Sequence, residues 1–361
     1  MNKLEKARCL INEADETIRE NFVKRMHAVE MVIDYKKQHD LPIYDEKREQ
    51  EVLMRNLNQL EDLSLSEYYK EFLEEVFRIS KQYQNACLHQ GVYGYQGMKG
   101  AFSQIATSQL FPEGKQKNYS KFEDVILAVL NHDIEKGVLP FENSTTGEVG
   151  EVIDLLYRYD VKISACYDLK VDQNLLGIKG SKITDLTKVY SKLEALEQCE
   201  EALKQFDFER IPYANTALAA KYVSETNDRT IGAIASKQCA KEYGLEILME
   251  NLNTDRDNTT RFIVIENELP NVSDKIMILL TLDHKSGALA AVMQTIADYK
   301  LNMTSIRSRA CRDKSWQYYF YIEIEGDIQD PNIQACFEKC KEQCEKLRVI
   351  GCVKEKKTWT L

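Results

Sequence analysis

The chain has 361 residues, of which 43% are hydrophobic and 29% charged, and its length favours two or three domains. Its net charge of −10 argues against a nucleic-acid partner, which requires a basic stripe to neutralise phosphates. No run of about eighteen apolar residues is present, and the acidic start lacks the apolar core of a signal peptide. We therefore expect a cytoplasmic protein that binds no membrane.

The ten cysteines lack the paired spacing of a disulfide framework, so reduced thiols are expected. Cys336, Cys340 and Cys344 recur at every fourth residue, on one face of a predicted helix. A metal site there would lack both a histidine and a CxxC pair, whereas cysteine also packs as a small apolar residue. We therefore favour the interpretation that these cysteines pack in the hydrophobic core. No metal or organic cofactor is expected.

Residues 1–88 are predicted to be entirely helical, because they contain no glycine and only one proline, Pro42. Apolar residues recur at helical spacing without interruption from Asn2 to about Gln38. A helix of that length measures roughly 50 Å, about twice the diameter expected for such a domain, so we expect it to pair with a second copy of the chain. Two further helices are predicted, at about 45–62 and 66–88.

Residues 90–268 alternate short apolar runs with amphipathic stretches, the pattern of an α/β domain or a pair of them. The stretch from 267 to 275 has the composition of a linker. The predicted helices are at 122–132 and 193–206. The predicted strands are at 92–97, 137–143, 161–169, 186–191, 230–236 and 260–267.

Residues 275–355 are predicted to fold as strand, helix, strand, strand, helix, strand, which suits a ferredoxin-like α+β sandwich. The predicted strands are at 276–283, 302–312, 317–326 and 347–353, and the helices at 287–300 and 332–347.

Charged residues of the helical segment fall into patches that a helix would align. Arg25 and Lys36 are close to three turns apart, about 16 Å along one face. Arg8 lies about 26 Å from Arg25 on the same helix, so a functional Arg8 would serve a partner subunit's site. Asp45, Arg48 and Glu49 share a face of the second helix, and Ser80 and Gln84 share a face of the third.

Each patch taken singly is more often solvated surface. Together, in type and spacing, the patches resemble the active-site set of the all-helical chorismate mutases. The resemblance implies that cations clamp the two substrate carboxylates and that donors stabilise charge on the breaking ether oxygen. It assigns the carboxylates to Arg25 and a partner's Arg8, the ether oxygen to Lys36 and Gln84, and the ring hydroxyl to Glu49 with the region of Asp45. Arg48 and Ser80 complete the pocket.

Glycines recur at every third residue in "GVYGYQGMKG" (91–100). A dinucleotide loop requires GxGxxG, so a glycine turn that opens a helix, with an anion site at the helix start, is the favoured alternative.

Two later stretches, "PFENSTTGEV" (140–149) and "NTTRFIVI" (258–265), place polar residues at strand ends, where ligands of open α/β sheets gather. Ordinary capping is the alternative for either one alone. Together they resemble prephenate dehydratase, which implies a two-lobed fold like that of solute-binding proteins. The resemblance makes Thr260 the acid that assists departure of hydroxide from prephenate. It makes Asn143, Ser144 and Thr145 substrate-binding residues, and we expect Arg261 to assist Thr260 electrostatically and to join the substrate site.

The chain departs from the dehydratase pattern at "SKLEAL" (191–196), where the family reads close to SHPQAL. Lys192 either replaces an anion contact or belongs to a structural loop. The departure motivates an alternative function: a working mutase fused to a catalytically weak or inactive sensor module.

The last segment resembles the ACT domain of such dehydratases, which binds phenylalanine at a dimer interface. The resemblance assigns effector binding to Gly287, Ala288, Leu289, Ser308 and Arg309, although Arg307 and Ala310 replace the Glu and Pro of its second motif. A domain kept for dimerisation alone is the alternative. The chain is thus expected to be a bifunctional, homodimeric enzyme of phenylalanine synthesis that converts chorismate to phenylpyruvate and responds to phenylalanine.

Overall fold

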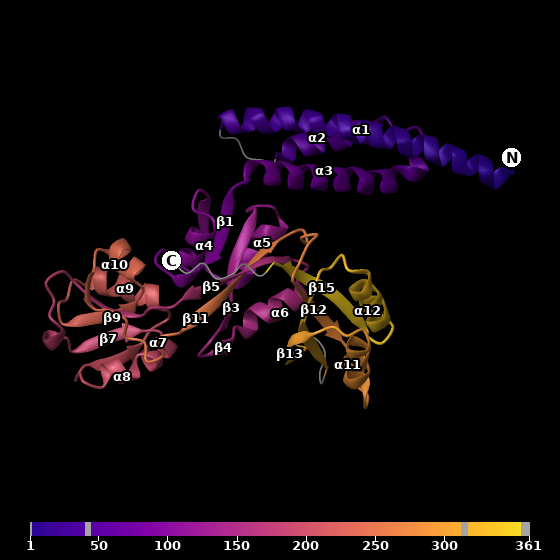
Figure 1. Cartoon of the computed structure of the whole chain (residues 1–361). Coiled ribbons are helices and arrows are strands. Elements are labelled where there is room, and N and C mark those ends of the chain that lie inside the picture. Colours follow the sequence, from indigo (N-terminus) through magenta and orange to yellow (C-terminus); the bar gives the residue numbers. More distant parts are fainter. Residues whose placement is uncertain (1, 40–44, 312–316, 355–361) are drawn as a thin grey trace. The chain divides into compact units, whose positions relative to one another are not determined.

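A computed structural model describes residues 2–39, 45–311 and 317–354 (Figure 1). The chain divides into two compact units. The first comprises Met1–Gln90 with Asn131–Ile134, and the second comprises Gly91–Leu130 with Glu135–Leu361.

The first unit consists of three helices, α1 (Lys3–His39), α2 (Glu46–Asn58) and α3 (Ser66–Leu88). The long first helix and the third helix confirm the prediction from periodicity. The second helix ends before the predicted residue 62, because Asp62 instead caps a short 3₁₀ turn (Leu63–Leu65) by accepting from the Ser64 amide.

The core of this unit is small. Leu53, Leu73 and Phe77 form its buried cluster, and Ile33 of α1 is also buried. The first half of the predicted apolar stripe on α1 is uncovered, since Leu4, Leu10, Ile11 and Ile18 are each more than half exposed. A single copy therefore leaves most of the apolar surface of α1 in contact with water.

The second unit contains two sheets. The ten-stranded sheet has the order β13-β14-β12-β15-β5-β11-β3-β1-β2, with β4 paired to β3. The five-stranded sheet has the order β10-β6-β9-β7-β8. The strands of the dehydratase-like part are β1 (Val92–Gln96), β2 (Lys115–Tyr119), β3 (Lys136–Asn143), β4 (Gly147–Glu148), β5 (Lys162–Lys170), β6 (Asn174–Gly177), β7 (Lys188–Ser191), β8 (Glu209–Pro212), β9 (Ile231–Ala235), β10 (Glu246–Met249) and β11 (Thr259–Glu266).

The chain crosses between the two sheets twice, after β5 and after β10, which produces two lobes. All six predicted strands are present. The helix predicted over 193–206 is instead broken at Cys199 into α7 (Leu193–Gln198) and α8 (Glu200–Leu203). The remaining helices of the lobes are α4 (Phe102–Leu110), α5 (Phe122–Leu130), α6 (Gly150–Arg158), α9 (Thr216–Thr226) and α10 (Lys237–Tyr243).

The C-terminal part has the predicted order of elements: β12 (Lys275–Thr281), α11 (Ala288–Asp298), β13 (Met303–Ala310), β14 (Tyr318–Glu325), α12 (Pro331–Lys341) and β15 (Lys346–Val353). Its strands are antiparallel in the ferredoxin-like order β13-β14-β12-β15, and both helices pack against one buried cluster. A parallel bridge between Gly351 and Ile163 joins this sheet to β5.

Cys336 and Cys340 of α12 are buried in that cluster, which confirms the core interpretation of the cysteine stripe. The predicted helix is too long, since α12 ends at Lys341 and Cys344 lies beyond it, partly buried against the same cluster. No group of histidine, cysteine and acidic residues within the described part of the chain is arranged to hold a metal ion.

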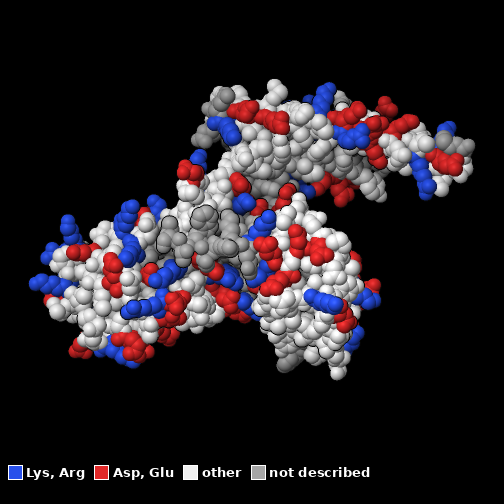
Figure 2. Space-filling model, viewed as in Figure 1, with Lys and Arg blue, Asp and Glu red and all other residues white. Residues whose placement is uncertain are grey.

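Over the ranges that the structure describes, no helix is long and apolar enough to cross a membrane. On the face seen in Figure 2, basic side chains lie interspersed with acidic ones and form no continuous stripe over the described residues.

Candidate active sites

Arg25 and Ser80 meet between α1 and α3. The Arg25 guanidinium donates to the Ser80 hydroxyl and lies 5.9 Å from the centroid of the Phe77 ring. Ser80 is 4% exposed and donates to the Val76 carbonyl at 2.7 Å. Burial lowers the pKa of Arg25 from its ordinary value. A partly buried guanidinium that no carboxylate among the described residues neutralises attracts an anion.

Lys36 lies on α1 within electrostatic reach of α2. Burial lowers the pKa of Lys36, while the charges of Asp45 and Glu49 act in the opposite direction. Glu49 also accepts from Lys81 of α3, with Nζ 3.1 Å from Oε2. Lys81 was not predicted, since a lone lysine beside Ser80 carries no pattern that separates it from the solvated surface.

Gln84 of α3 is 8% exposed. Its Nε2 donates to the Ser80 carbonyl at 3.3 Å, whereas its Oε1 has no hydrogen-bond partner among the described residues. Buried polar atoms are normally paired, so an unpaired amide oxygen marks a position where a ligand group is expected.

Two predicted residues are not brought to this centre within one chain. The Arg48 side chain is 61% exposed and pairs with Glu51 at 3.5 Å, and Arg8 is exposed on the first half of α1. Asp45 is the N-cap of α2 and accepts from the Arg48 amide at 3.0 Å. The described centre therefore unites Arg25, Lys36, Glu49, Ser80 and Gln84.

The second centre lies where β3 pairs with β11. Thr260 is in register with Asn143, and Asn143 Nδ2 donates to Thr260 Oγ1 at 2.9 Å. The same amide nitrogen donates to Asn258 Oδ1 at 2.7 Å. Asn143 Oδ1 accepts from the backbone amides of Thr145 and Thr146, each at 3.0 Å. The Asn143 side chain therefore stabilises the loop that follows β3 and also holds the Thr260 hydroxyl in place.

This contact has a chemical consequence. Because Thr260 Oγ1 accepts a hydrogen bond from Asn143, the hydroxyl hydrogen of Thr260 is left to donate elsewhere. The same bond stabilises negative charge on the oxygen as the proton leaves, which makes the hydroxyl a better acid.

Arg261, which we expected to assist Thr260, pairs with Asp168. Its Nε and Nη2 donate to the two carboxylate oxygens of Asp168, at 2.8 and 3.0 Å. This pairing raises the pKa of Arg261. Since successive strand residues point to opposite faces, the guanidinium lies across the strand from the Thr260 hydroxyl, whereas the Asn143 amide contacts that hydroxyl directly.

Asn258 is the residue that sequence reasoning missed. It is 1% exposed, accepts from Asn143, and donates to Gln198 Oε1 of α7 at 3.1 Å. It thereby connects the two lobes beside the candidate acid. Ser144 pairs with Thr259 through both its amide, at 2.8 Å, and its hydroxyl, at 3.0 Å.

The "SKLEAL" departure and the glycine turn of the dehydratase lobes both have local partners. Lys192 precedes α7, is half exposed and pairs with Glu194 at 2.8 Å. The Gly100 amide donates to Gln104 Oε1 at 2.6 Å, so this N–H is not available to an anion. A Cβ on Gly100 would lie 2.7 Å from the Cys239 sulfur, so the glycine turn serves packing between the lobes.

In the C-terminal part, a cavity of about 130 Å³ contains two of the five predicted effector residues, Ala288 and Leu289. Gly287 precedes them in a left-handed conformation with φ of 82° and caps α11. Ser308 and Arg309 lie on β13 and do not line the cavity, since Arg309 pairs with Asp154 and with Glu148, each at 2.7 Å. The other residues that line it are Leu282, Asp283, His284, Lys285, Gln317, Tyr318 and Phe320.

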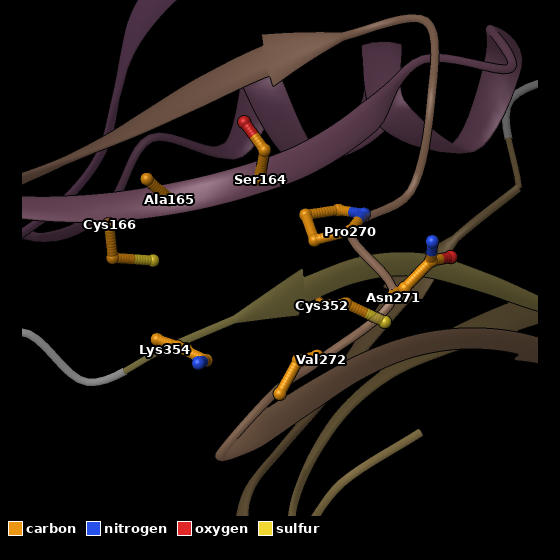
Figure 3. A pocket seen from close by; sticks show the side chains of 8 residues that line it. All are labelled: Ser164, Ala165, Cys166, Pro270, Asn271, Val272, Cys352 and Lys354. Carbon is orange, nitrogen blue, oxygen red and sulfur yellow. The ribbon is translucent and has the colours of Figure 1, made fainter. Parts of the chain in front are cut away.

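A larger cavity of about 340 Å³ opens where β15 diverges from β5 (Figure 3). It contains none of the predicted site residues. Burial raises the pKa of its thiols, to about 12 for Cys166 and about 11 for Cys352. Both thiols therefore stay protonated at neutral pH and are poor nucleophiles.

Comparison with known proteins identifies the families of the two parts of the chain that contain these centres. The family model for chorismate mutase type II matches residues 7–85, and that for prephenate dehydratase matches residues 93–270. The bifunctional chorismate mutase/prephenate dehydratase of Aquifex aeolicus is 30% identical over 361 residues, covering 97% of this chain and 98% of that protein. The enzyme of the same name from Buchnera aphidicola subsp. Schizaphis graminum is 30% identical over 370 residues, covering 97% and 96%.

The crystal structure of prephenate dehydratase from Arthrobacter aurescens in complex with L-Phe covers 73% of this chain and 90% of its own, with a TM-score of 0.69 and 21% identity, which establishes the shared fold. The chain belongs to the family of bifunctional chorismate mutase/prephenate dehydratases, and it converts chorismate to prephenate and prephenate to phenylpyruvate in phenylalanine biosynthesis.

Proposed function

We propose that Arg25, Lys36, Glu49, Ser80 and Gln84 form the mutase active site. The contact between the Arg25 guanidinium and the buried Ser80 hydroxyl, which brings together two predicted residues from α1 and α3, carries this assignment most directly. Arg25 would bind a substrate carboxylate, and Lys36 with a Gln84 N–H would stabilise the charge that develops on the ether oxygen. Glu49 would accept from the ring hydroxyl, with Asp45 and Arg48 at the rim.

We further propose that the site is completed by Arg8 of a second copy, in a homodimer built on α1. The supporting observation is the exposed stripe of Leu4, Ile11 and Ile18 on a helix that would be about 55 Å long. An exposed apolar face of this length favours pairing with an identical helix, because a symmetric interface covers both stripes at once.

Mixing two inactive variants tests this arrangement. Arg8→Ala and Lys36→Met chains are each expected to lack mutase activity. After the two are unfolded and refolded together, about a quarter of wild-type activity should return, because each mixed dimer has one site with both residues intact. Arg25→Met mixed with Lys36→Met is the control, since both residues belong to the same chain's centre and no recovery is expected. Recovery in the control, or none in the first mixture, would rule out the borrowed Arg8.

For the dehydratase reaction we propose Thr260 as the acid. As the ring carboxylate leaves as CO2, its bonding electrons enter the ring and expel the hydroxyl group, which departs as water with the proton of Thr260. Solvent then restores that proton. Asn143 would act mainly by orienting Thr260, with Ser144 and Thr145 fixing the loop. Arg261, which we predicted to bind substrate, is left out of this proposal, because its guanidinium pairs with Asp168 on the other face of the strand.

We propose that the C-terminal part is an ACT domain that senses phenylalanine, with Gly287, Ala288 and Leu289 at the effector site. The cavity beside Leu289 supports this proposal, as does the L-Phe bound in the Arthrobacter relative. Ser308 and Arg309 would act from the neighbouring strand. We also propose that the enzyme works in the cytoplasm, where its free thiols stay reduced.

Phenylalanine is expected to inhibit the dehydratase reaction, and Leu289→Ala should raise the concentration required for half-inhibition about tenfold by removing apolar contact with the effector. Each variant's rate without phenylalanine serves as its own reference. Tyrosine provides the matched control ligand, since it differs from phenylalanine only by its hydroxyl group. A dehydratase rate independent of phenylalanine would contradict the sensor and favour a domain kept for dimerisation.

A further inference from the structure

A cation from the C-terminal sheet reaches the dehydratase centre. Arg307 on β13 donates from Nη2 to Glu142 Oε2 at 2.7 Å. Glu142 directly precedes Asn143 on β3 and lies in register with Arg261 on β11. The ion pair thus joins two residues that are 165 positions apart in the chain, and it ends one residue from the amide that holds Thr260.

The guanidinium of Arg307 is held in one place. It lies 5.5 Å from the centroid of the Phe141 ring and 5.6 Å from that of Tyr321, and its side chain is 17% exposed. Its Nη1 is buried without a hydrogen-bond partner among the described residues. Stacking against two rings and shielding from water strengthen the pair with Glu142 relative to an exposed one.

The strand β3 is irregular just before its end. The register between β3 and β11 shifts after Arg261, so that Phe262 lies opposite Pro140 and Phe141 is an extra residue in the strand. Pro140 has no N–H to donate to the ladder. Glu142 and Asn143 lie beyond this irregularity, paired with β11 on one side and with the two-residue strand β4 on the other, and the contact from Arg307 adds a side-chain restraint there.

We propose that Arg307 is a positioning residue of the dehydratase site, supplied by the C-terminal domain. Its pair with Glu142 fixes the end of β3 and thereby the Asn143 amide and the Thr260 hydroxyl. The inference rests on the proposed roles of those two residues. The pair thus connects the C-terminal part of the chain with the end of β3.

Substitution of Arg307 tests the proposal, with kcat and KM for prephenate as the readouts. Arg307→Met keeps the length of the side chain between the rings and removes the charge. It is expected to lower kcat about tenfold and to change KM less than twofold, since the displaced group acts on the proton in the transition state. Arg307→Lys, which retains the charge, should restore most of kcat. The mutase activity of each preparation reports the fraction of intact enzyme.

Arg348→Met is the matched control. Arg348 is also 17% exposed and also reaches the dehydratase part from the C-terminal sheet, but it donates to the carbonyls of Leu156 and Tyr157 at the end of α6. It should leave kcat for prephenate unchanged. Glu142→Gln should lower kcat as Arg307→Met does, and the double variant should fall no further than the lower of the two.

Several results would overturn the proposal: an Arg307→Met kcat within twofold of wild type, a lysine variant no better than the methionine one, or an equal loss in Arg348→Met. The proposal stays testable even if Arg307→Met folds poorly, because kcat is measured separately for Arg307→Lys and for the control Arg348→Met. The Thr260→Val variant tests the proposed acid independently of the role of Arg307. If it retains full activity, the acid assignment fails whatever Arg307 does.

Discussion

Thr260→Val is expected to lower kcat of the dehydratase reaction by about 100-fold or more, the scale of a lost general acid. Valine has the shape of threonine, so the fold and the β3–β11 pairing are retained while the hydroxyl is lost. The assay supplies prephenate and follows the absorbance of phenylpyruvate. The mutase rate, measured with chorismate on the same preparation, should not change.

Thr259→Val is the control for this prediction. Thr259 neighbours Thr260 on β11, but its hydroxyl donates to the Asp257 carbonyl at 2.9 Å and takes no part in the contact with Asn143. We expect its kcat to stay within a few-fold of wild type. Equal losses in both variants would point to a disturbed strand and would remove the argument for an acid.

Lys36→Met is expected to reduce mutase kcat by roughly 100-fold to 1,000-fold, as loss of one preorganised donor to a developing oxyanion does. Prephenate turnover should be unaffected. Because burial lowers the pKa of Lys36, the wild-type mutase rate should also fall as the pH rises through that lowered value and the cation is lost.

The adjacent lysine provides the comparison. Lys37 donates to the Cys87 carbonyl at 3.4 Å and lies off the face that carries Arg25 and Lys36. Lys37→Met should therefore keep its mutase activity and its pH profile. A near-wild-type rate in Lys36→Met would refute the assignment of the ether-oxygen donor.

The helical period predicted some of the residues of the mutase part that turn inward. Arg25 and Ser80 meet as expected because spacing along a straight helix fixes direction. Periodicity could not place Arg48. Arg48 precedes Glu49 by one residue, which is about 100° around the helix, so Arg48 stays in solvent while Glu49 faces Lys81.

The dehydratase centre was only partly predictable. Its motifs identify Asn143 and Thr260, because polar residues after a buried strand mark a sheet end. They do not reveal that Asn143 holds Thr260 while Arg261 pairs with Asp168, since this depends on strand register between segments more than ninety residues apart. Asn258 was missed because it lies in a polar run without periodicity. The strand β2 was missed because "KQKNY" is polar and exposed at the sheet edge.

The central claim is that one chain carries two separate catalytic centres, and turnover of prephenate tests it most directly. Wild-type enzyme and Lys36→Met should both convert prephenate to phenylpyruvate at the same rate, whereas Thr260→Val should convert chorismate only as far as prephenate. Mixing the two variants should restore the full conversion of chorismate to phenylpyruvate. No phenylpyruvate from prephenate at any concentration of wild-type enzyme would contradict the account and leave a mutase joined to an inactive ligand-binding module.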